Sequence, residues 1–339
     1  MAKNVLLVGG GAVGAIAALN LEAGGSKVTV VLRSNFNVVS TEGYTIESCD
    51  HGSIKNWRPH SVLNQIPDVK EQASPPFDYI VCTTKNVADV PPSLAELIGP
   101  AVTPGHTAIV LVQNGLNIEK PLIAAFPDNV IISGVSLIGA NEPFPGTIHQ
   151  DFPDTLYIGA FPNLKISPQQ TEMVAKDFVD LYARGGKTKC EYSSDVGWTR
   201  WRKLVYNACL NPICAITGLD TGRIRLADGA VEGLVRPAME EIRAAAAASG
   251  HVLPEDVAHN MIEMDPLNMY LPPSMLSDVR KGNFIEYENI LGEPLREGKA
   301  LGVPMPTVQV LYHLCRAIQW RNKEAKGLVE IPPKGNFVG

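Results

Sequence analysis

The chain lacks the features that mark membrane, nucleic-acid-binding and disulfide-linked proteins. Beyond the N-terminal region, no stretch approaches the roughly 18 uninterrupted apolar residues of a membrane-spanning helix. The net charge is −6, so there is no basic footprint for nucleic acid or for an anionic membrane. The six cysteines are scattered, without a CxxC pair, which argues against structural zinc and indicates a reducing compartment. We therefore expect a cytoplasmic protein.

The 339 residues are enough for two domains that each bury a core. In the first half, short aliphatic runs alternate with amphipathic helical stretches, a pattern typical of a parallel sheet covered on both faces. The expected strands are Val5–Val8, Val28–Leu32, Tyr79–Thr83, Ala108–Val112 and Val130–Leu137, and the expected helices between them are Val13–Ala23, Pro92–Ile98 and Ile118–Phe126.

Helical periodicity dominates the second half. Pro168–Arg184 predicts one helix, and the further helical segments are 196–217, 228–249, 254–264, 283–301 and 305–323. We therefore predict an α/β fold. A Rossmann-type, dinucleotide-binding domain spans 1–193, an all-helical substrate and catalytic domain spans 194–330, and a flexible tail spans 331–339.

Two segments of the first half are harder to assign. Residues 34–76 contain one strand candidate, Gly43–Glu47, and otherwise resemble an irregular insertion. Thr147–His149 and Thr155–Ile158 are expected to add antiparallel edge strands to the sheet.

Glycines 9, 11 and 14 form Gly-x-Gly-x-x-Gly directly after the first expected strand. In this position glycine allows a tight turn, close approach of the backbone to a pyrophosphate and close helix–sheet packing. Ala12 and Val13 then begin a helix whose N–H groups and positive dipole end face the phosphates. The glycines also argue against reading the apolar N-terminus as a signal peptide. We expect a dinucleotide site, the alternative being a purely structural turn.

The end of the second strand favours the phosphorylated cofactor. A site that prefers NAD(H) usually has an acid about 20 residues after the glycines, bonded to the ribose 2′-hydroxyl. Here the strand ends in Arg33 and Ser34, of which the arginine can bind a phosphate bidentately and the serine adds a donor. The alternative is an exposed arginine that merely closes a strand. Lys85 and Asn114 follow two further strands and are suited to phosphate, ribose or substrate contacts.

Lys203, Asn207 and Asn211 lie four residues apart in a largely apolar run, so a helix would place them on one stripe. A cation and two amides on a buried helix are costly unless each has a polar partner. A polar ligand would be such a partner. The alternative is a lysine that reaches solvent and two amides bonded to neighbouring helices. Pro212 predicts a kink or helix end at Asn211.

Together these features resemble one family, the ketopantoate reductases (2-dehydropantoate 2-reductases), and its fungal members most. The resemblance runs over nearly the whole chain. Its most specific parts are the Trp201–Pro212 segment and the Ser274–Asp278 segment that leads to Glu286. It implies that NADPH reduces ketopantoate to pantoate, with Lys203 and Glu286 as the catalytic residues.

The resemblance also implies which residues bind each ligand. The substrate residues would be Asn114, Asn207, Asn211 and Ser274. The cofactor residues would be Gly9, Gly11, Ala12, Val13, Gly14, Arg33, Ser34, Lys85 and Asn114, with Arg33 and Lys85 at the 2′-phosphate. Lys203 would face a nicotinamide held by Gly9–Gly14, as electrophile and proton donor, with Glu286 across from it.

Some alternatives stay open. Glu286 and Glu288 also fit an acidic first turn of a helix, without a catalytic role. Residues 34–76 and 141–155 depart from the family pattern, which leaves room for another 2-oxo acid, a ketone or an imine as substrate. A non-catalytic NADP(H) sensor is a third possibility. The helical domain is a candidate homodimer surface, and no nucleic-acid or membrane partner is expected.

Overall fold

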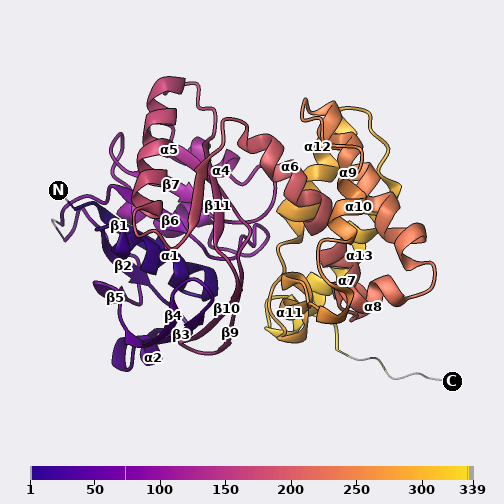
Figure 1. Ribbon diagram of the computed structural model, residues 1–339, viewed down its shortest axis with the longest axis horizontal. Coiled ribbons are helices and arrows are strands. Elements are labelled where there is room, and N and C mark those ends of the chain that lie inside the picture. The colour runs from indigo at the N-terminus through magenta and orange to yellow at the C-terminus, as the bar shows by residue number, and fades with distance from the viewer. Residues whose placement is uncertain (1, 73, 334, 336–339) are drawn as a thin grey trace. The chain divides into compact units, whose positions relative to one another are not determined.

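The computed structural model of the protein describes residues 2–72, 74–333 and 335. The chain divides into two compact units: unit 1 comprises residues 1–86 and 90–199, and unit 2 comprises residues 87–89 and 200–339. Unit 1 contains all the strands of these described residues, and unit 2 is helical (Figure 1). No helix in the described ranges is long and apolar enough to cross a membrane. Most of the predicted tail, residues 334 and 336–339, lies outside the described residues.

The core of unit 1 is a mainly parallel sheet, as predicted, but two of its eight strands, Ser61–Leu63 and Lys189–Tyr192, were not expected. Its strand order is β12-β11-β8-β7-β6-β1-β2-β5. The strands are β1 (Asn4–Val8), β2 (Lys27–Val31), β5 (Ser61–Leu63), β6 (Tyr79–Cys82), β7 (Ala108–Leu111), β8 (Ile131–Ser136), β11 (Thr155–Ala160) and β12 (Lys189–Tyr192). The chain runs outward from β1 in one direction through β2 and in the other through β6. Ligands of such sheets bind at the carboxyl ends of the strands beside this reversal.

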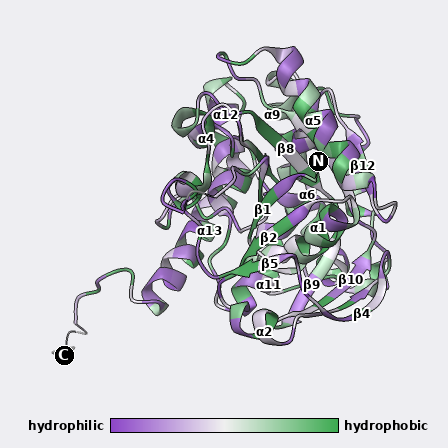
Figure 2. Ribbon diagram, turned by 90° about the vertical axis from the view of Figure 1, so that its left-hand side faces the viewer, coloured by the Kyte–Doolittle hydropathy of each residue, from purple (hydrophilic) through white to green (hydrophobic). Residues whose placement is uncertain are grey.

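Helices cover both faces of the main sheet. They are α1 (Ala12–Ala23), α2 (Phe36–Thr41), α3 (Leu94–Ile98), the short 3₁₀ helix η1 (Gly99–Ala101), α4 (Lys120–Ala125) and α5 (Pro168–Ala183). Val5 and Leu7 of β1 join the core that contains α1 and α5, whereas Leu6 and Val8 join the core that contains α3 and α4. Because both faces of β1 are buried, its sequence is a continuous aliphatic run. Figure 2 shows β1, β2 and α1 coloured by hydropathy.

Residues from 44–57 pair with residues from 139–152. They form a second, four-stranded sheet in the order β4-β3-β10-β9. Its strands are β3 (Tyr44–Ser48), β4 (Gly52–Trp57), β9 (Gly139–Phe144) and β10 (Thr147–Phe152). The prediction of an irregular insertion over 34–76 was therefore wrong, although the strand candidate Gly43–Glu47 is confirmed as β3.

The predicted edge strands also need correction. Thr147–His149 belongs to β10, which pairs in parallel with β3 in the second sheet rather than with the main sheet. Thr155–Ile158 belongs to β11, which pairs antiparallel with β8 as expected. It is not an edge, however, because β12 lies outside it in parallel. The residues that cover β11 come from beyond α5, and nothing within its own sequence signals them.

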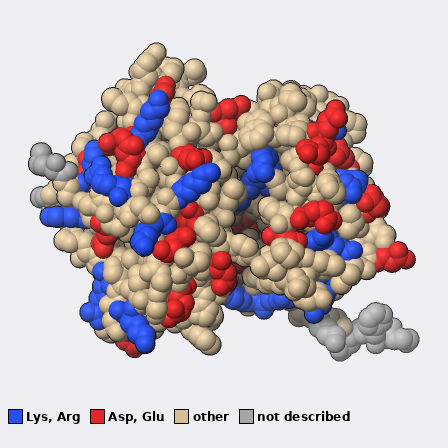
Figure 3. Space-filling view, viewed as in Figure 1, with Lys and Arg blue, Asp and Glu red and all other residues tan. Residues whose placement is uncertain are grey.

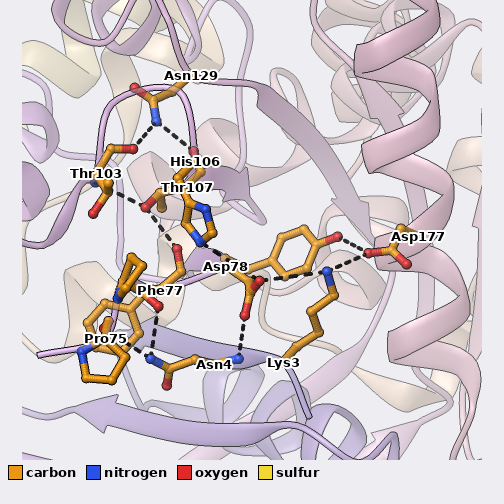
Figure 4. Close-up of polar contacts among 12 residues, drawn as sticks. Lys3, Asn4, Pro75, Phe77, Asp78, Thr103, His106, Thr107, Asn129 and Asp177 are labelled. Atoms are coloured by element: carbon orange, nitrogen blue, oxygen red, sulfur yellow. Dashed lines mark hydrogen bonds and ion pairs between the residues drawn. The ribbon is translucent and has the colours of Figure 1, made fainter. Parts of the chain in front are cut away.

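The amino ends of the main-sheet strands are fixed by a polar network (Figure 4). The Asp78 carboxylate accepts a hydrogen bond from the backbone N–H of Asn4 at 2.8 Å. Lys3 lies 3.7 Å from Asp78 and 3.3 Å from Asp177 of α5. The Asn129 amide donates to the carbonyl of Thr107 at 2.8 Å. These contacts join β1, β6, β7 and the approach to β8 at the edge opposite the expected ligand site.

Unit 2 contains helices joined by short loops. They are α6 (Val196–Asn207, whose first residues belong to unit 1), α7 (Leu210–Thr217), α8 (Thr221–Leu226), the π-helix η2 (Val231–Val235), α9 (Arg236–Ala248), α10 (Val257–Ile262), η3 (Leu267–Met269), α11 (Ser274–Arg280), the π-helix η4 (Glu288–Gly292), α12 (Glu293–Ala300) and α13 (Pro306–Ala325). The predicted helix 196–217 is therefore two helices, and the predicted helix 283–301 begins only at Tyr287.

A three-residue excursion of the first half, residues 87–89, belongs to unit 2. The Asp89 carboxylate accepts a hydrogen bond from the Gln319 amide at 3.0 Å and lies 2.7 Å from the Lys323 ammonium. The Lys323 ammonium also donates to the Asp89 carbonyl at 2.8 Å. Burial and the Asp89 charge raise the pKa of Tyr287, whose hydroxyl donates to the same carboxylate. Asp89 thus ties η4 to α13.

Candidate cofactor and substrate site

Three of the four N-terminal glycines are required by the packing of unit 1. Gly9 has φ +102°, and a Cβ there would lie 2.7 Å from the backbone nitrogen of Thr84. A Cβ on Gly10 would lie 2.1 Å from Leu32 Cδ2, and one on Gly14 would lie 1.9 Å from the Gly9 carbonyl oxygen. The turn between β1 and α1 therefore requires glycine at positions 9 and 14, where a Cβ would meet backbone atoms, and at position 10 a Cβ would displace buried side chains.

Gly11 differs, because no protein contact requires it. It is exposed and has φ −71°, which any residue can adopt. The nearest atom to a Cβ there is Glu142 Oε2, at 3.7 Å. Gly11 is also the N-cap of α1, where it offers no side-chain acceptor, and the first turn of α1 has no acid. The missing side chain leaves space beside a helix N-terminus, which fits the pyrophosphate of a dinucleotide.

Gly11→Ala and Gly14→Ala are expected to separate ligand binding from packing. Gly11→Ala should change the free energy of unfolding of the cofactor-free protein by less than about 0.5 kcal/mol. It should raise the Kd for NADPH at least tenfold, because its methyl group fills the space beside the helix end. Gly14→Ala should lower the free energy of unfolding by about 1–3 kcal/mol through overpacking. Urea unfolding and NADPH fluorescence titration measure these effects, and an unchanged Kd in Gly11→Ala would remove the pyrophosphate assignment.

The ends of β2, β6 and β7 place the other predicted cofactor residues. Arg33 and Ser34 are exposed directly after β2. Lys85 follows β6 and is exposed, and Asn114 follows β7 and is partly buried. These last two strand ends are adjacent, because Cys82 pairs with Leu111. The Gln113 amide donates to the Thr84 carbonyl at 2.8 Å and joins the two loops. The structure thus brings Lys85 and Asn114 to neighbouring positions.

The predicted polar stripe of unit 2 spans two helices. Lys203 is partly buried on α6, Asn207 is the last residue of α6 and is 8% exposed, and Asn211 is in the first turn of α7 and is 2% exposed. Two buried amides flank a break in an apolar segment. The helix break that Pro212 predicts is present but falls at Ala208 and Cys209 rather than at Asn211.

The position of the break has a simple cause. Pro212 is the third residue of α7. The N–H groups of the first turn of a helix have no partner within the helix, so the missing N–H of proline costs little there. The chain therefore ends α6 early and begins α7 ahead of the proline, instead of ending the helix at it.

Glu286 lies on the loop before η4 and is buried, with 5% of its surface exposed. The loop is held by α13: the Gln319 side-chain oxygen accepts from the Ile285 N–H at 3.0 Å, and the Asn322 amide donates to the Asn283 carbonyl at 2.7 Å. Asn289, one turn later in η4, is 7% exposed. A π-helical turn often marks a functional site. Glu286 itself precedes η4, and the acid within the first turn of η4 is Glu288.

Ser274 is the first residue of α11 and is exposed. Helix α11 packs against α7, which carries Asn211. Asp278 on the same helix is 8% exposed, as suits a structural residue. The predicted substrate residues therefore divide by unit: Asn114 lies in unit 1, and Asn207, Asn211 and Ser274 lie in unit 2 with Lys203 and Glu286.

The cysteines near these residues are not poised to act as nucleophiles. Burial raises the pKa of Cys82, at the end of β6, to about 12. Burial likewise raises the pKa of Cys209, in the helix break, and raises that of Cys214 to about 12. All three stay protonated thiols near neutral pH. Among the described residues, no group of His, Cys, Asp or Glu could hold a metal ion.

The sequence-based reasoning missed three polar residues around these positions. Asn289 could have been found, because it lies three residues after Glu286, about one helical turn along the chain. Asn35, which directly follows the predicted Arg33–Ser34 pair, is 6% exposed and bonds the glycine turn. Glu142, on the second sheet, accepts a hydrogen bond from the same Asn35 amide. Its position depends on strand pairing that no local pattern reveals.

Comparison with known proteins places this chain among oxidoreductases. Two family models match it: Ketopantoate reductase PanE/ApbA over residues 5–163 and Ketopantoate reductase PanE/ApbA C terminal over residues 195–319. An uncharacterised protein of Saccharomyces cerevisiae is 38% identical, with 98% of each chain covered.

Solved structures agree with this assignment. The crystal structure of 2-dehydropantoate 2-reductase from Methylococcus capsulatus is 32% identical, with a TM-score of 0.77, over 94% of this chain and 97% of that one. A ternary structure of D-mandelate dehydrogenase with NADH and anilino(oxo)acetate has a TM-score of 0.78 at 20% identity, over 95% of this chain and 100% of that one. At that identity the likeness shows a shared fold alone.

Proposed function

The chain belongs to the ketopantoate reductase family, and on that premise we propose that it is an NADPH-dependent oxidoreductase that reduces 2-dehydropantoate (ketopantoate) to pantoate. The observation that carries the proposal is the α6–α7 segment, where Lys203 and two buried amides interrupt an apolar pair of helices. These polar groups suit a small, polar carbonyl substrate. Pantothenate synthesis is the role that this activity would serve.

Residues of unit 1 would hold the cofactor. The open space at Gly11 and the N-terminus of α1 suit the pyrophosphate. Arg33, Ser34 and Lys85 would supply charge and donors for a 2′-phosphate from the ends of β2 and β6, the two strands that flank β1. When bound, the reduced nicotinamide supplies the hydride for the carbonyl carbon of the substrate.

Lys203 would act on the carbonyl oxygen. As hydride reaches the carbon, negative charge develops on that oxygen, and it must be stabilised and then protonated. An ammonium group does both: its charge stabilises the developing alkoxide, and one of its protons completes the alcohol. The reaction then balances as one hydride added to carbon and one proton added to oxygen.

The remaining residues of unit 2 would orient the reacting groups. Asn207 and Asn211 offer amide donors and acceptors from buried positions, so they can fix the substrate without losing much side-chain freedom. Glu286 would orient Lys203 or accept a hydrogen bond from a substrate hydroxyl. Its loop is fixed by Gln319 and Asn322, which suits such a role. Ser274 is exposed at the start of α11 and would help to hold the substrate carboxylate.

A second candidate is the reduction of another 2-oxo acid, a ketone or an imine. The second sheet favours it, because β3, β4, β9 and β10 lie outside the motifs that carry the family resemblance. A non-catalytic NADP(H) sensor is disfavoured, because Lys203 and Glu286 are both present.

A steady-state panel tests the proposal. Purified protein is assayed for NADPH oxidation with ketopantoate, pyruvate, 2-oxoisovalerate and phenylglyoxylate, and each assay is repeated with NADH. We expect kcat/KM to be highest for ketopantoate, and higher with NADPH than with NADH. A higher value for another acid would move the assignment to the second candidate. Absence of turnover with all four would favour the sensor.

A further inference from the structure

The loop that carries Glu286 is anchored on both sides of that residue. Ile285 comes directly before it, and its N–H donates to the Gln319 side-chain oxygen at 3.0 Å. Tyr287 comes directly after it, and its hydroxyl donates to Asp89 Oδ2 at 3.4 Å. Both neighbours are buried within unit 2. The backbone of Glu286 is therefore fixed by contacts of the two residues that flank it.

Both anchors lead to one carboxylate. The Gln319 amide, which is buried, donates to Asp89 Oδ1 at 3.0 Å. An ionised carboxylate can only accept a hydrogen bond, and the backbone N–H of Ile285 can only donate one. The Gln319 amide therefore has a single orientation that satisfies both groups. Asp89 sets that orientation, and through it the position of the Ile285 N–H.

Asp89 is itself held in two ways. The Lys323 ammonium lies 2.7 Å from Oδ2 of its carboxylate and donates to its backbone carbonyl at 2.8 Å. The second contact belongs to the backbone, so it survives a change of the Asp89 side chain. A substitution at this position therefore removes the carboxylate without releasing residues 87–89 from α13, which makes the role of the carboxylate open to a direct test.

We propose that Asp89 is a positioning residue for Glu286, acting through Gln319 and Tyr287. The inference rests on the catalytic role of Glu286 in the proposed function, and it adds to that role a residue encoded in the first half of the chain. Asp89 also lies four residues after Lys85, which is a proposed cofactor residue. The test must therefore separate an effect on Glu286 from an effect on the cofactor.

A double-mutant cycle of Asp89→Ala and Glu286→Gln makes this separation. The readout is kcat at saturating NADPH with the 2-oxo acid that gives the highest kcat/KM, corrected for the folded fraction. Asp89→Ala should lower kcat about tenfold, since a displacement of 1 Å costs about 10²-fold and a released loop moves by less. Added to Glu286→Gln, it should cause no further loss, because it acts through the group already removed. Losses that multiply would assign the effect to Lys85 or elsewhere and overturn the proposal.

Asp89→Asn separates the hydrogen bond from the charge. Asparagine keeps an oxygen for the Gln319 amide but offers no charge to Lys323, so it should restore most of the kcat lost in Asp89→Ala. An asparagine variant as slow as the alanine variant would contradict the route through Gln319. If Asp89→Ala does not fold, Asp89→Ser, whose side chain is one atom shorter than aspartate, takes its place with the same expected result.

The matched control is another carboxylate of the same unit. Acidic and basic side chains are interspersed on the face of the protein drawn in Figure 3. Glu232 is exposed and forms an ion pair with Arg236 at 2.8 Å. Glu232→Ala removes the same charge as Asp89→Ala, together with its ion pair, and should leave kcat unchanged.

Hydrogen exchange tests the hold on the loop without any substrate. Peptides that cover residues 283–292 should exchange faster in Asp89→Ala, whereas peptides from α9 should not. Unchanged exchange at 283–292 would overturn the proposal. Kinetics then distinguish the two levels of the inference. A normal kcat in Glu286→Gln would remove the proposed role of Glu286 as well, whereas a normal kcat in Asp89→Ala beside an impaired Glu286→Gln would remove the role of Asp89 alone.

Discussion

Lys203→Ala is expected to lower kcat for ketopantoate by about 10³-fold while leaving the Kd for NADPH within about twofold. Loss of an electrostatic donor to a developing oxyanion costs about 10²–10³ in kcat, and loss of a proton donor typically costs 10²–10⁴. The two losses overlap because one group serves both purposes, so they do not multiply. The proposed cofactor residues lie in unit 1 and Lys203 lies in unit 2, so cofactor binding should survive.

The control variants for Lys203 separate its charge from its proton. Lys203→Arg keeps a positive charge but does not release a proton near neutral pH. It should therefore retain part of the electrostatic effect and recover only a fraction of kcat. Lys299→Ala removes an exposed lysine of α12 in the same unit and should leave kcat unchanged. Stopped-flow measurement of NADPH oxidation under single-turnover conditions reports the chemical step, and a normal rate in Lys203→Ala would refute the assignment.

Asp154→Ala should destabilise unit 1 by about 3–5 kcal/mol. Its Oδ2 accepts hydrogen bonds from the Asn20 amide, the Tyr182 hydroxyl and the Thr188 hydroxyl, each at 2.9 Å. These donors come from α1, from α5 and from the loop before β12. Alanine would leave several buried donors without an acceptor, at about 1–3 kcal/mol for each group that water cannot reach. Asp154 is 2% exposed, so water has little access to these donors.

Hydrogen exchange can show which helices and strands lose stability in Asp154→Ala. Peptides from α1, α5 and β12 should exchange faster in Asp154→Ala, whereas those from α9 and α13 in unit 2 should not. Asp180→Ala, at an exposed position of α5, is the matched control and should show no change. Uniform acceleration in both units would mean that the network does not act locally.

The buried Asp154 carboxyl should also make the stability of unit 1 depend on pH. Burial raises the pKa of its carboxyl above 3.8, and the hydrogen bonds from Tyr182 and Thr188 oppose that rise. The folded state therefore holds the proton more tightly than the unfolded state. The contribution of Asp154 to stability is complete below pH 3.8 and declines as the pH rises through the folded-state pKa. Asp154→Asn does not titrate, so its deficit relative to the wild type should shrink as pH rises through that window.

Local sequence patterns predicted the central strands of the main sheet well, because these strands carry their signal within themselves. The short strands β5 and β12 have no continuous buried run and were not predicted. The aliphatic residues of β1 and β6 to β8 are buried on both faces, which gives continuous apolar runs. The glycine turn was predicted equally well. A Cβ on Gly14 would meet the Gly9 carbonyl oxygen, and a Cβ on Gly9 would meet Thr84 in the loop after β6.

The second sheet could not be predicted in the same way. Strand β4 is mostly exposed and β9 contains Pro143, so neither has a clear alternating pattern. Their positions follow from the parallel pairing of β3 with β10, which joins residues far apart in the chain. Glu142 was missed for that reason. Arg33 was singled out because its position follows from the end of β2 alone.

Asp89 has a consequence for how the two halves of this protein could be separated or exchanged. A fragment that starts at residue 200 would carry Gln319, which is 1% exposed, without the carboxylate that its amide bonds. Lys323 would lose its ion partner in the same fragment. A fragment cut at residue 200 therefore lacks contacts that hold α13 in the whole chain. In a chimera made with a relative, residues 87–89 must come from the same parent as residues 200–339, although they are encoded within the other half.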